Sequence, residues 1–305
     1  MTKPTIHYAF PHQVNKDLTA IVDNVNSCID TYTFIPLPVR AALKAASFGK
    51  LVAFIYPHAA PELLLPCGRL VLWIFIFDDL YGPLPVSDLI QVHGKLTAIL
   101  NGDLTYANEH IMLQHFALSH QELSPYITPL WLERYIADWQ YFFEGMILDK
   151  QYSYQSTIIY PSIEEYMILR EKVGGIYPFI TLSEIIAGFI LPPEIFRHPA
   201  IQQARLTVSK LVTWTNDLFS VNKERENNEA MNLVAVIQNE HGCSWEEAYN
   251  TAISMHNQVL AAYITLRASW PNFGDFHARV ETYISLLEYM ISGNLAWYAD
   301  NPRYQ

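Results

Sequence analysis

The sequence has 305 residues, of which 51% are hydrophobic, 13% aromatic and only 16% charged, and its formal net charge is −11. So large an apolar share predicts an extensive core, or a core that encloses an apolar cavity. The acidic balance and the lack of any run of Lys or Arg exclude the basic surface with which proteins bind nucleic acids, and a phosphorylated substrate would need cations or well-placed basic residues to reverse the local field.

Apolar residues recur at helical spacing along the chain, and no alternating segments are joined by a hairpin turn. Ser162 with Glu165, and Ser244 with Glu247, form capping boxes that mark helix starts. No flexible linker, low-complexity segment or repeat divides the chain, so we expect one all-α domain over residues 1–305. The predicted helices are, in chain order, 17–33, 38–55, 61–81, 86–101, 105–122, 127–149, 162–174, 177–191, 198–224, 230–240, 245–270 and 274–297.

The predicted helix 61–81 contains the strongest apolar run of the chain, at 63–77. That run holds Pro66 and Arg69 and is too short to span a bilayer, so we interpret it as a buried helix. The N-terminal segment lacks the hydrophobic stretch of a signal peptide, and the scattered cysteines, without a Cys-x-x-Cys pair, predict free thiols. We therefore expect a cytoplasmic protein without an integral membrane segment.

Two carboxylates, Asp78 and Asp79, stand near the end of this apolar helix. Burying charge there is unfavourable unless a partner compensates it. A divalent metal is a natural partner, because Mg²⁺ takes oxygen ligands from one or two carboxylates and from substrate phosphates. A solvated helix end next to Gly82 and Pro83 would show the same two residues.

The predicted helix 198–224 ends in a polar face. Asn216, Ser220 and Glu224 are spaced four residues apart, so their oxygens follow one side of the helix with a drift of only about 40° per step. Amide, hydroxyl and carboxylate oxygens suit a hard cation, and Lys223 adds a positive charge for a phosphate group. An ordinary solvated face would show the same spacing.

Together these two motifs resemble those of the class I terpene synthases, particularly the single-domain bacterial branch. The segment 216–224 resembles that family's Asn/Ser/Glu metal motif, including the lysine before the glutamate, and Asp78 with Asp79 resembles the start of its aspartate-rich motif. The segment 56–59 resembles the stretch that precedes the aspartate-rich helix, and the similarity continues to the C-terminal end of the chain.

Two further features match the same family. The segment 161–170 resembles the helix that carries the family's diphosphate-sensing arginine, here Arg170, at the usual 46-residue distance from Asn216. Arg303 and Tyr304 stand where the C-terminal Arg-Tyr pair is expected. One departure is plain, because Gly82 occupies the position at which the aspartate-rich motif normally ends in a third acid.

The resemblance implies a helical bundle of the class I terpenoid synthase type with a central apolar cavity. It implies three Mg²⁺ ions held between Asp78 on one side and Asn216, Ser220 and Glu224 on the other, with a diphosphate bridging them. Asp79 and Asp217 would orient ligands or pair with arginines. The implied donors to the diphosphate oxygens are Arg170, Lys223, Arg303 and Tyr304.

The resemblance also assigns residues to the carbocation side of the reaction. Val173 would be the linker and Gly174 the effector at a helix break after the sensor arginine, although a simple glycine-capped terminus would look the same. Aromatic faces stabilise positive charge. The candidate residues for the cavity wall are Val173 and three aromatic residues, each of which could equally be plain core: Trp73, Phe77 and Trp297.

The function implied is that of a carbon–oxygen lyase, a terpene cyclase that ionises an allylic isoprenoid diphosphate. Farnesyl diphosphate is the favoured substrate and a sesquiterpene hydrocarbon or alcohol the product. Geranyl or geranylgeranyl diphosphate would make the chain a mono- or diterpene synthase. The same motifs leave open a chain-elongating prenyltransferase and a non-catalytic isoprenoid-binding protein, and a homodimer is possible.

Overall fold

The computed structural model describes residues 4, 6–153, 155, 157–227, 229–299 and 301–304. Within these residues every regular element is a helix, so the predicted all-α fold class is confirmed. The α-helices are α1 (Leu18–Thr31), α2 (Leu37–Ala46), α3 (Phe48–Ile55), α4 (Pro61–Tyr81), α5 (Val86–Leu100), α6 (Ile111–Leu123), α7 (Pro129–Asp149), α8 (Ile163–Val173), α9 (Tyr177–Ile186), α10 (Pro193–Phe196), α11 (Pro199–Glu226), α12 (Leu233–His241), α13 (Trp245–Ala268) and α14 (His277–Ala299). Short 3₁₀ helices are η1 (Ser124–Tyr126), η2 (Gly274–Phe276) and η3 (Pro302–Tyr304).

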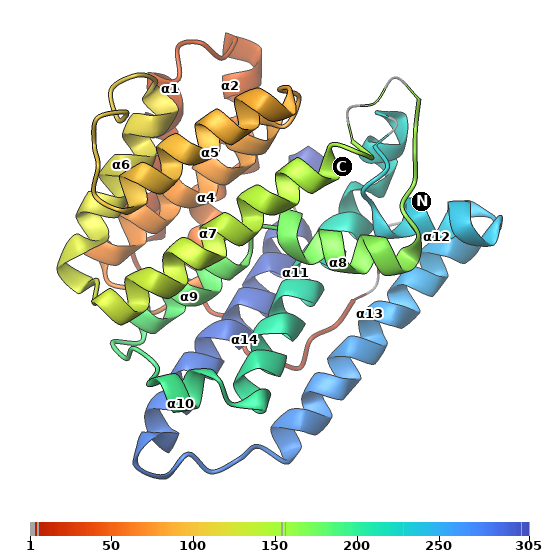
Figure 1. Cartoon of the computed structure of the whole chain (residues 1–305). Helices are drawn as coiled ribbons and strands as arrows, with labels where there is room; N and C mark the ends of the chain where they lie inside the picture. Colours follow the sequence, from red (N-terminus) through yellow and green to blue (C-terminus); the bar gives the residue numbers. More distant parts are fainter. Residues whose placement is uncertain are drawn as a thin grey trace.

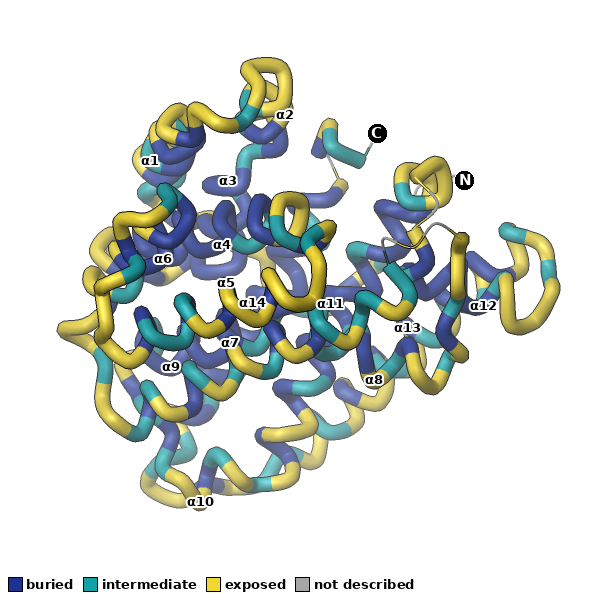
Figure 2. Tube along the Cα trace, turned by 45° about the horizontal axis from the view of Figure 1, so that its top comes forward, coloured by how far each residue is buried: buried dark blue, intermediate teal, exposed yellow. Residues whose placement is uncertain are grey.

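The helices form a bundle in which an inner set surrounds a cavity and an outer set packs around it (Figure 1). The inner set comprises α3, α4, α7, α8, α9, α11 and α14. On one side α1, α5 and α6 pack against this set, and on the other α12 and α13 pack against α8 and α11. Figure 2 shows the resulting pattern, with α3 almost wholly buried and exposed residues along the outward faces.

Local sequence signals explain where several helices begin. Both predicted capping boxes are present: the Ser162 hydroxyl accepts from the Glu165 backbone N–H while the Glu165 carboxylate accepts from Ser162, and Ser244 and Glu247 repeat the arrangement. Helix α4 begins with Pro61 at a position where a missing N–H costs nothing. Because α4 is apolar around most of its circumference, it is buried on most sides.

The predicted helix 38–55 is in fact two helices, α2 and α3. The chain breaks at Ser47, whose φ of 52° is left-handed. The break frees backbone carbonyl groups, and the C-terminal part of the chain satisfies them: Trp297 Nε1 donates to the Ala46 carbonyl at 2.9 Å and Asn301 Nδ2 donates to the same oxygen at 2.8 Å. The correction therefore has a tertiary cause that the local pattern does not contain.

Two other predicted helices have different limits. The predicted helix 105–122 begins only at Ile111, because Asp103 accepts hydrogen bonds from the backbone and hydroxyl of Thr105 and holds a turn there. The predicted helix 177–191 ends at Ile186, close to Gly188, whose φ is 62°. The short helix α10 was not predicted.

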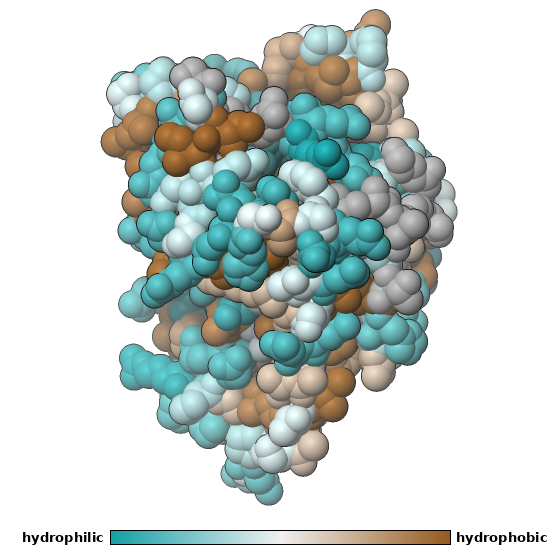
Figure 3. Space-filling model, turned by 90° about the vertical axis from the view of Figure 1, so that its right-hand side faces the viewer, coloured by the Kyte–Doolittle hydropathy of each residue, from teal (hydrophilic) through white to brown (hydrophobic). Residues whose placement is uncertain are grey.

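The molecular surface is mixed in character. The face in Figure 3 intersperses hydrophilic and hydrophobic residues, with no continuous apolar belt. Among the described helices none combines the length and the apolar character that crossing a membrane would require.

Candidate active site

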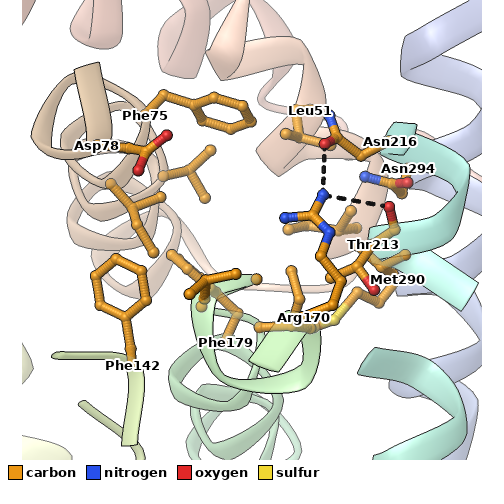
Figure 4. A pocket seen from close by; sticks show the side chains of 18 of the residues that line it. Leu51, Phe75, Asp78, Phe142, Arg170, Phe179, Thr213, Asn216, Met290 and Asn294 are labelled. Carbon is orange, nitrogen blue, oxygen red and sulfur yellow. Dashed lines mark hydrogen bonds between the residues drawn. The ribbon is translucent and has the colours of Figure 1, made fainter. Parts of the chain in front are cut away.

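An apolar chamber of about 160 Å³ lies at the centre of the inner helices. Its walls come mainly from aliphatic and aromatic side chains of α3, α4, α7, α9, α11 and α14. Figure 4 shows Asp78 and Phe142 on one side of this pocket, and Arg170, Thr213 and Asn216 on the other. Asp78 and Asn216 thus face the same cavity, on opposing helices.

Helix α4 divides its side chains between the chamber and the core. Val71, Ile74, Phe75 and Asp78 line the chamber, because residues three, four and seven positions apart share one helix face. Asp78 is therefore the polar end of a stripe that is otherwise apolar. The stripe was predictable by counting back from Asp78 in steps of three and four.

The structure places Trp73, Phe77 and Trp297 in the packed core and not on the wall of either pocket, which corrects the prediction. Trp73 and Phe77 stack at 4.4 Å between ring centroids on the opposite side of α4, where Trp73 Nε1 donates to the Met112 carbonyl. Trp297 is 1% exposed and holds the break between α2 and α3. The aromatic residues that do line the chamber are Phe75, Phe142, Phe179 and Tyr298.

A wider polar basin of about 720 Å³ opens above the chamber and shares Phe75, Asp78, Arg170, Val173 and Asn216 with it. Five carboxylates and three basic side chains line this basin among the described residues. The carboxylates are those of Asp78, Asp79, Asp149, Glu224 and Glu229, and the basic residues are Arg170, Lys223 and Arg303. The excess of carboxylates favours the binding of cations, and the basic side chains can bind an anion that accompanies those cations.

Two carboxylates of the basin have pKa values near neutrality. The Asp78 side chain is exposed to the open basin, but protein surrounds it closely. This partial desolvation, followed by repulsion from Asp79 and Asp149, raises its pKa to about 7. Burial, followed by repulsion from Asp217 and Glu229, raises the pKa of Glu224 to about 7. A cation bound between these groups would relieve the repulsion.

The three predicted ligands on α11 occupy successive turns of the helix. Asn216 lines both pockets and Glu224 lines the basin, where the Asn232 side chain donates to Glu224 Oε2 at 2.7 Å. Ser220 is 1% exposed, does not line either pocket, and donates its hydroxyl to the Asn216 carbonyl at 2.7 Å. Of the three, Ser220 is the one that would have to turn its hydroxyl to reach a ligand.

Arg170 connects the sensor helix α8 to α11. Its Nη2 donates to Asn216 Oδ1 at 2.8 Å and to Asp217 Oδ1 at 2.6 Å. Asp217 is wholly buried and also accepts from the Tyr166 hydroxyl and from the Leu233 backbone N–H. Burial lowers the pKa of the Arg170 guanidinium, but Asp217, Tyr166 and Glu224 together outweigh this effect and raise that pKa, so Arg170 stays cationic.

Gly174 and Gly175 follow the sensor helix α8 and allow the chain to pack closely against α11 and α4. A Cβ atom on Gly174 would lie 2.3 Å from Thr213 Cγ2 of α11, and one on Gly175 would lie 2.4 Å from Ile74 Cδ1 of α4. Gly175, with φ of 61°, adopts the left-handed conformation that caps a helix, whereas Gly174 remains in the right-handed region. Gly174 is thus required for close approach and not for capping, and Val173 and Gly174 both line the chamber.

The C-terminal pair closes the basin. Arg303 Nη2 lies 3.7 Å from Asp79 Oδ2 and its guanidinium lies 5.8 Å from the ring centroid of Phe75. Tyr304 packs edge-on against Tyr298 and Trp297. Both residues line the basin together with Lys223.

Asp149, at the end of α7, is a basin residue that the sequence analysis missed. Burial raises its pKa to about 6. Its Oδ1 atom is buried and accepts no hydrogen bond. The neighbouring Lys150 Nζ donates to the Gly82 carbonyl at 2.8 Å, so Asp149 lies beside the position at which the aspartate-rich motif lacks its third acid. No local pattern marks Asp149, since only the packing of α7 on α4 brings it there.

The donors present fit a hard divalent cation. All predicted ligands offer oxygen, and the unpaired Oδ1 of Asp149 adds another acceptor at the same basin. Within the described residues no three His, Cys, Asp or Glu side chains gather closely enough to hold a metal by themselves. Asp78 on α4 and Asn216 and Glu224 on α11 face the basin, so these are the residues that would hold a metal here.

Comparisons with known proteins agree with this geometry. Residues 69–262 match the family described as terpene synthase family 2, C-terminal metal binding. The (+)-eremophilene synthase of Sorangium cellulosum is 28% identical over 86% of this chain and 80% of its own. A (+)-T-muurolol synthase of Roseiflexus castenholzii, named as farnesyl diphosphate cyclizing, is 26% identical over 87% of this chain and 82% of its own.

Solved structures share the fold. The germacradien-4-ol synthase of Streptomyces citricolor superposes with a TM-score of 0.81 at 19% identity, covering 97% of this chain and 98% of its own. An α-eudesmol synthase superposes with a TM-score of 0.82 at 21% identity, covering 97% and 99%. The family match spans more than half of the chain and includes the metal motif, so the chain belongs to the metal-binding terpene synthases of family 2 and is a class I terpene synthase.

Proposed function

We propose that this enzyme is a Mg²⁺-dependent sesquiterpene synthase that ionises farnesyl diphosphate and converts the cation into a sesquiterpene hydrocarbon or alcohol, with release of diphosphate. The observation that carries the proposal is that Asp78, on one side of an apolar chamber, faces Arg170 and Asn216 on the other. Relatives named as farnesyl diphosphate cyclizing support the choice of substrate.

The proposed metal ligands are Asp78 on α4 and Asn216, Ser220 and Glu224 on α11, with three Mg²⁺ ions expected. When bound, the ions would supply charge stabilisation for the leaving diphosphate. Arg170, Lys223, Arg303 and Tyr304 would donate to its oxygens, which strengthens the same effect where charge develops. Asp79 would hold Arg303, and Asp217 would hold Arg170, at the distances described above.

Arg170 would change partners when substrate binds. In the free enzyme it occupies the Asn216 oxygen that a metal would use. Metal binding to Asn216 would release one guanidinium N–H toward the diphosphate, while Asp217 keeps the arginine in place. The helix break at Val173 and Gly174 then lies next to the reacting end of the chamber, where we propose the linker and effector roles.

The chamber below would shield the carbocation. Its aliphatic lining keeps bulk water away from the cation, and the faces of Phe75, Phe142 and Phe179 can stabilise positive charge without reacting. The basin is polar and the chamber apolar, which matches a substrate with an anionic head and a hydrocarbon tail.

The test is to incubate purified enzyme and Mg²⁺ with ten-, fifteen- and twenty-carbon allylic diphosphates, and to measure both volatile products and released diphosphate. We expect a sesquiterpene from the fifteen-carbon substrate, and loss of turnover by about a hundredfold or more in Asp78→Asn. Longer diphosphates formed when a homoallylic diphosphate is added would instead indicate a prenyltransferase. Binding without release of diphosphate would indicate a non-catalytic binding protein.

A further inference from the structure

Asn294 is an unpartnered amide in the wall of the apolar chamber. It lies on α14, is 6% exposed, and makes no hydrogen bond to any described residue. Figure 4 shows it on the same side of the pocket as Asn216 and Thr213. Its Oδ1 atom is buried without a donor.

The other neutral polar side chains of the chamber are satisfied by protein groups. Asn216 Nδ2 donates to the Tyr298 hydroxyl at 2.7 Å, and the Thr213 hydroxyl donates to the Ser209 carbonyl at 2.8 Å. A buried amide without partners is unfavourable, and an apolar leucine, which has the same branched shape, would avoid the loss. Retaining an asparagine here therefore points to a ligand that the amide binds within the chamber.

The position of Asn294 relates it to the reacting end of the substrate. Met290, Asn294 and Tyr298 stand four residues apart and all line the chamber, so they form one stripe on α14. Tyr298 lies at the end of this stripe nearest the proposed metal site, because its hydroxyl accepts a hydrogen bond from Asn216. Asn294 lies one turn deeper, about 6 Å along the helix axis, just inside the apolar part.

We propose that Asn294 holds a water molecule in the chamber and directs it at the carbocation, so that the principal product is a terpene alcohol. This inference rests on the proposed function. A carboxamide can turn either its oxygen or its NH₂ group to the chamber, and water is a small ligand that can use both. With the amide oxygen accepting one O–H of the water, a lone pair on the water oxygen remains free.

The bond changes balance without any further reagent. Ionisation breaks the allylic C–O bond, and the electron pair leaves with diphosphate. The water lone pair then forms a new C–O bond to the cationic carbon. The extra proton on that oxygen passes to the released diphosphate at the mouth. Asn294 acts as a positioning residue, since it neither gains nor loses a bond.

The experiment compares products made in ¹⁸O-labelled water by the wild type, Asn294→Leu and a control, Ser292→Ala. Ser292 is a buried polar residue on the same helix that donates to the Pro11 carbonyl and does not line the chamber. We expect the wild type and the control to form an ¹⁸O-labelled alcohol. In Asn294→Leu the ratio of alcohol to hydrocarbon should fall by about tenfold or more, with diphosphate release kept within a few fold.

Two results would overturn the inference while leaving the proposed function intact. One is a wild-type product that contains only hydrocarbon and no label. The other is an alcohol fraction in Asn294→Leu equal to that of the wild type. The wild-type label decides the first case even if the variant folds poorly, and thermal melts show whether it does. Absence of diphosphate release from every substrate in the wild type would overturn both.

Discussion

Arg170 shows how single side chains of the site depend on one another. It donates to Asn216 Oδ1 and to Asp217 Oδ1, which are neighbours on α11. In our proposal Asp217 holds the arginine in place, whereas Asn216 binds a metal ion. Asp217 has three hydrogen-bonding partners and no exposure, so it is a fixed anchor. Asn216 faces the open cavity, and in our proposal it exchanges its hydrogen bond with Arg170 for a metal ion.

The close contact between Gly174 and Thr213 can be tested with one substitution that creates a steric clash and a second that removes it. Gly174→Ala would place Cβ 2.3 Å from Thr213 Cγ2, so the helix break must move away from α11. We expect a loss of stability of about 1–3 kcal/mol and at least about tenfold in kcat.

Thr213→Ser removes the obstructing methyl group but keeps the hydroxyl that binds the Ser209 carbonyl. The double variant Gly174→Ala/Thr213→Ser should therefore recover most of the lost melting temperature and kcat. If the second substitution recovers neither quantity, steric approach to α11 is not what requires Gly174.

The raised pKa values predict how the stability of the metal-free enzyme depends on pH. The pKa values of Asp78 and Glu224 are raised to about 7 in the folded enzyme, whereas in the unfolded chain both carboxyl groups have their ordinary, lower pKa values. Between the ordinary carboxyl pKa and pH 7, the folded state binds more protons than the unfolded state. These two groups therefore make the free energy of unfolding fall as the pH rises toward 7.

Urea unfolding in the presence of a chelator, at pH 5 and at pH 7, measures this effect. Asp78→Asn is neutral at both values and supplies the reference. We expect the wild type to lose more stability than Asp78→Asn over this range. Equal losses in both proteins would mean that Asp78 titrates at its ordinary value.

At the scale of elements, α4 has two faces, one of which packs in the core while the other lines the chamber. One face packs Trp73 and Phe77 against α6 and α7. The other carries Val71, Ile74 and Phe75 to the chamber and ends in Asp78. The packed core face of α4 therefore fixes the position of Asp78, the proposed metal ligand, at the end of the chamber.

A buried ion pair joins α7 to the end of α9 and the segment after it. Arg134 Nη1 lies 3.1 Å from Glu184 Oε2, and Arg134 Nη2 donates to the Leu191 carbonyl at 2.8 Å. The Leu191 backbone N–H donates to the same Glu184 oxygen, and the guanidinium stacks on Phe196 at 3.9 Å. This cluster fixes the outer end of the helices whose inner ends line the chamber.

Arg134→Met should be strongly destabilising, because it leaves the wholly buried Glu184 carboxylate without its cation. We expect a loss of about 3–5 kcal/mol in the free energy of unfolding, measured by urea denaturation. The exposed pair of Lys44 and Asp30 is the matched control, and Lys44→Met should cost about 0–1 kcal/mol. Similar losses in the two variants would contradict the structural role of the buried cluster.

At the scale of the molecule, opposing helices hold the two halves of the proposed metal site apart across the basin. Since the proposed ligands come from both α4 and α11, and a bound anion would complete them, metal and diphosphate should each need the other. We expect Mg²⁺ alone, or diphosphate alone, to raise the melting temperature little. Both together, at about 100 times the apparent Kd, should stabilise the fold by about 2.7 kcal/mol.

Differential scanning fluorimetry with the four combinations of Mg²⁺ and diphosphate measures this cooperativity. Glu224→Gln should abolish the joint effect, and the free variant should melt at a temperature no lower than that of the free wild type. Full stabilisation by Mg²⁺ alone would show a preformed metal site and contradict the prediction. A homodimer remains a prediction that sedimentation velocity can check.

The sequence by itself determined the helical class, most helix limits and the two motifs. Helical periodicity, capping boxes and the spacing of Asn216, Ser220 and Glu224 are properties of short segments, and short segments obey local geometry. For the same reason α4 was predicted with the limits that the structure has.

Only the tertiary structure decided which side chains face the cavity. The break at Ser47 depends on Trp297 and Asn301 from the other end of the chain, and Asp149 reaches the basin through the packing of α7 on α4. The aromatic wall is formed by four residues, each from a different helix: Phe75, Phe142, Phe179 and Tyr298. A cavity is the space left between helices that meet from distant parts of the chain, so its lining follows from how they pack and not from any one segment.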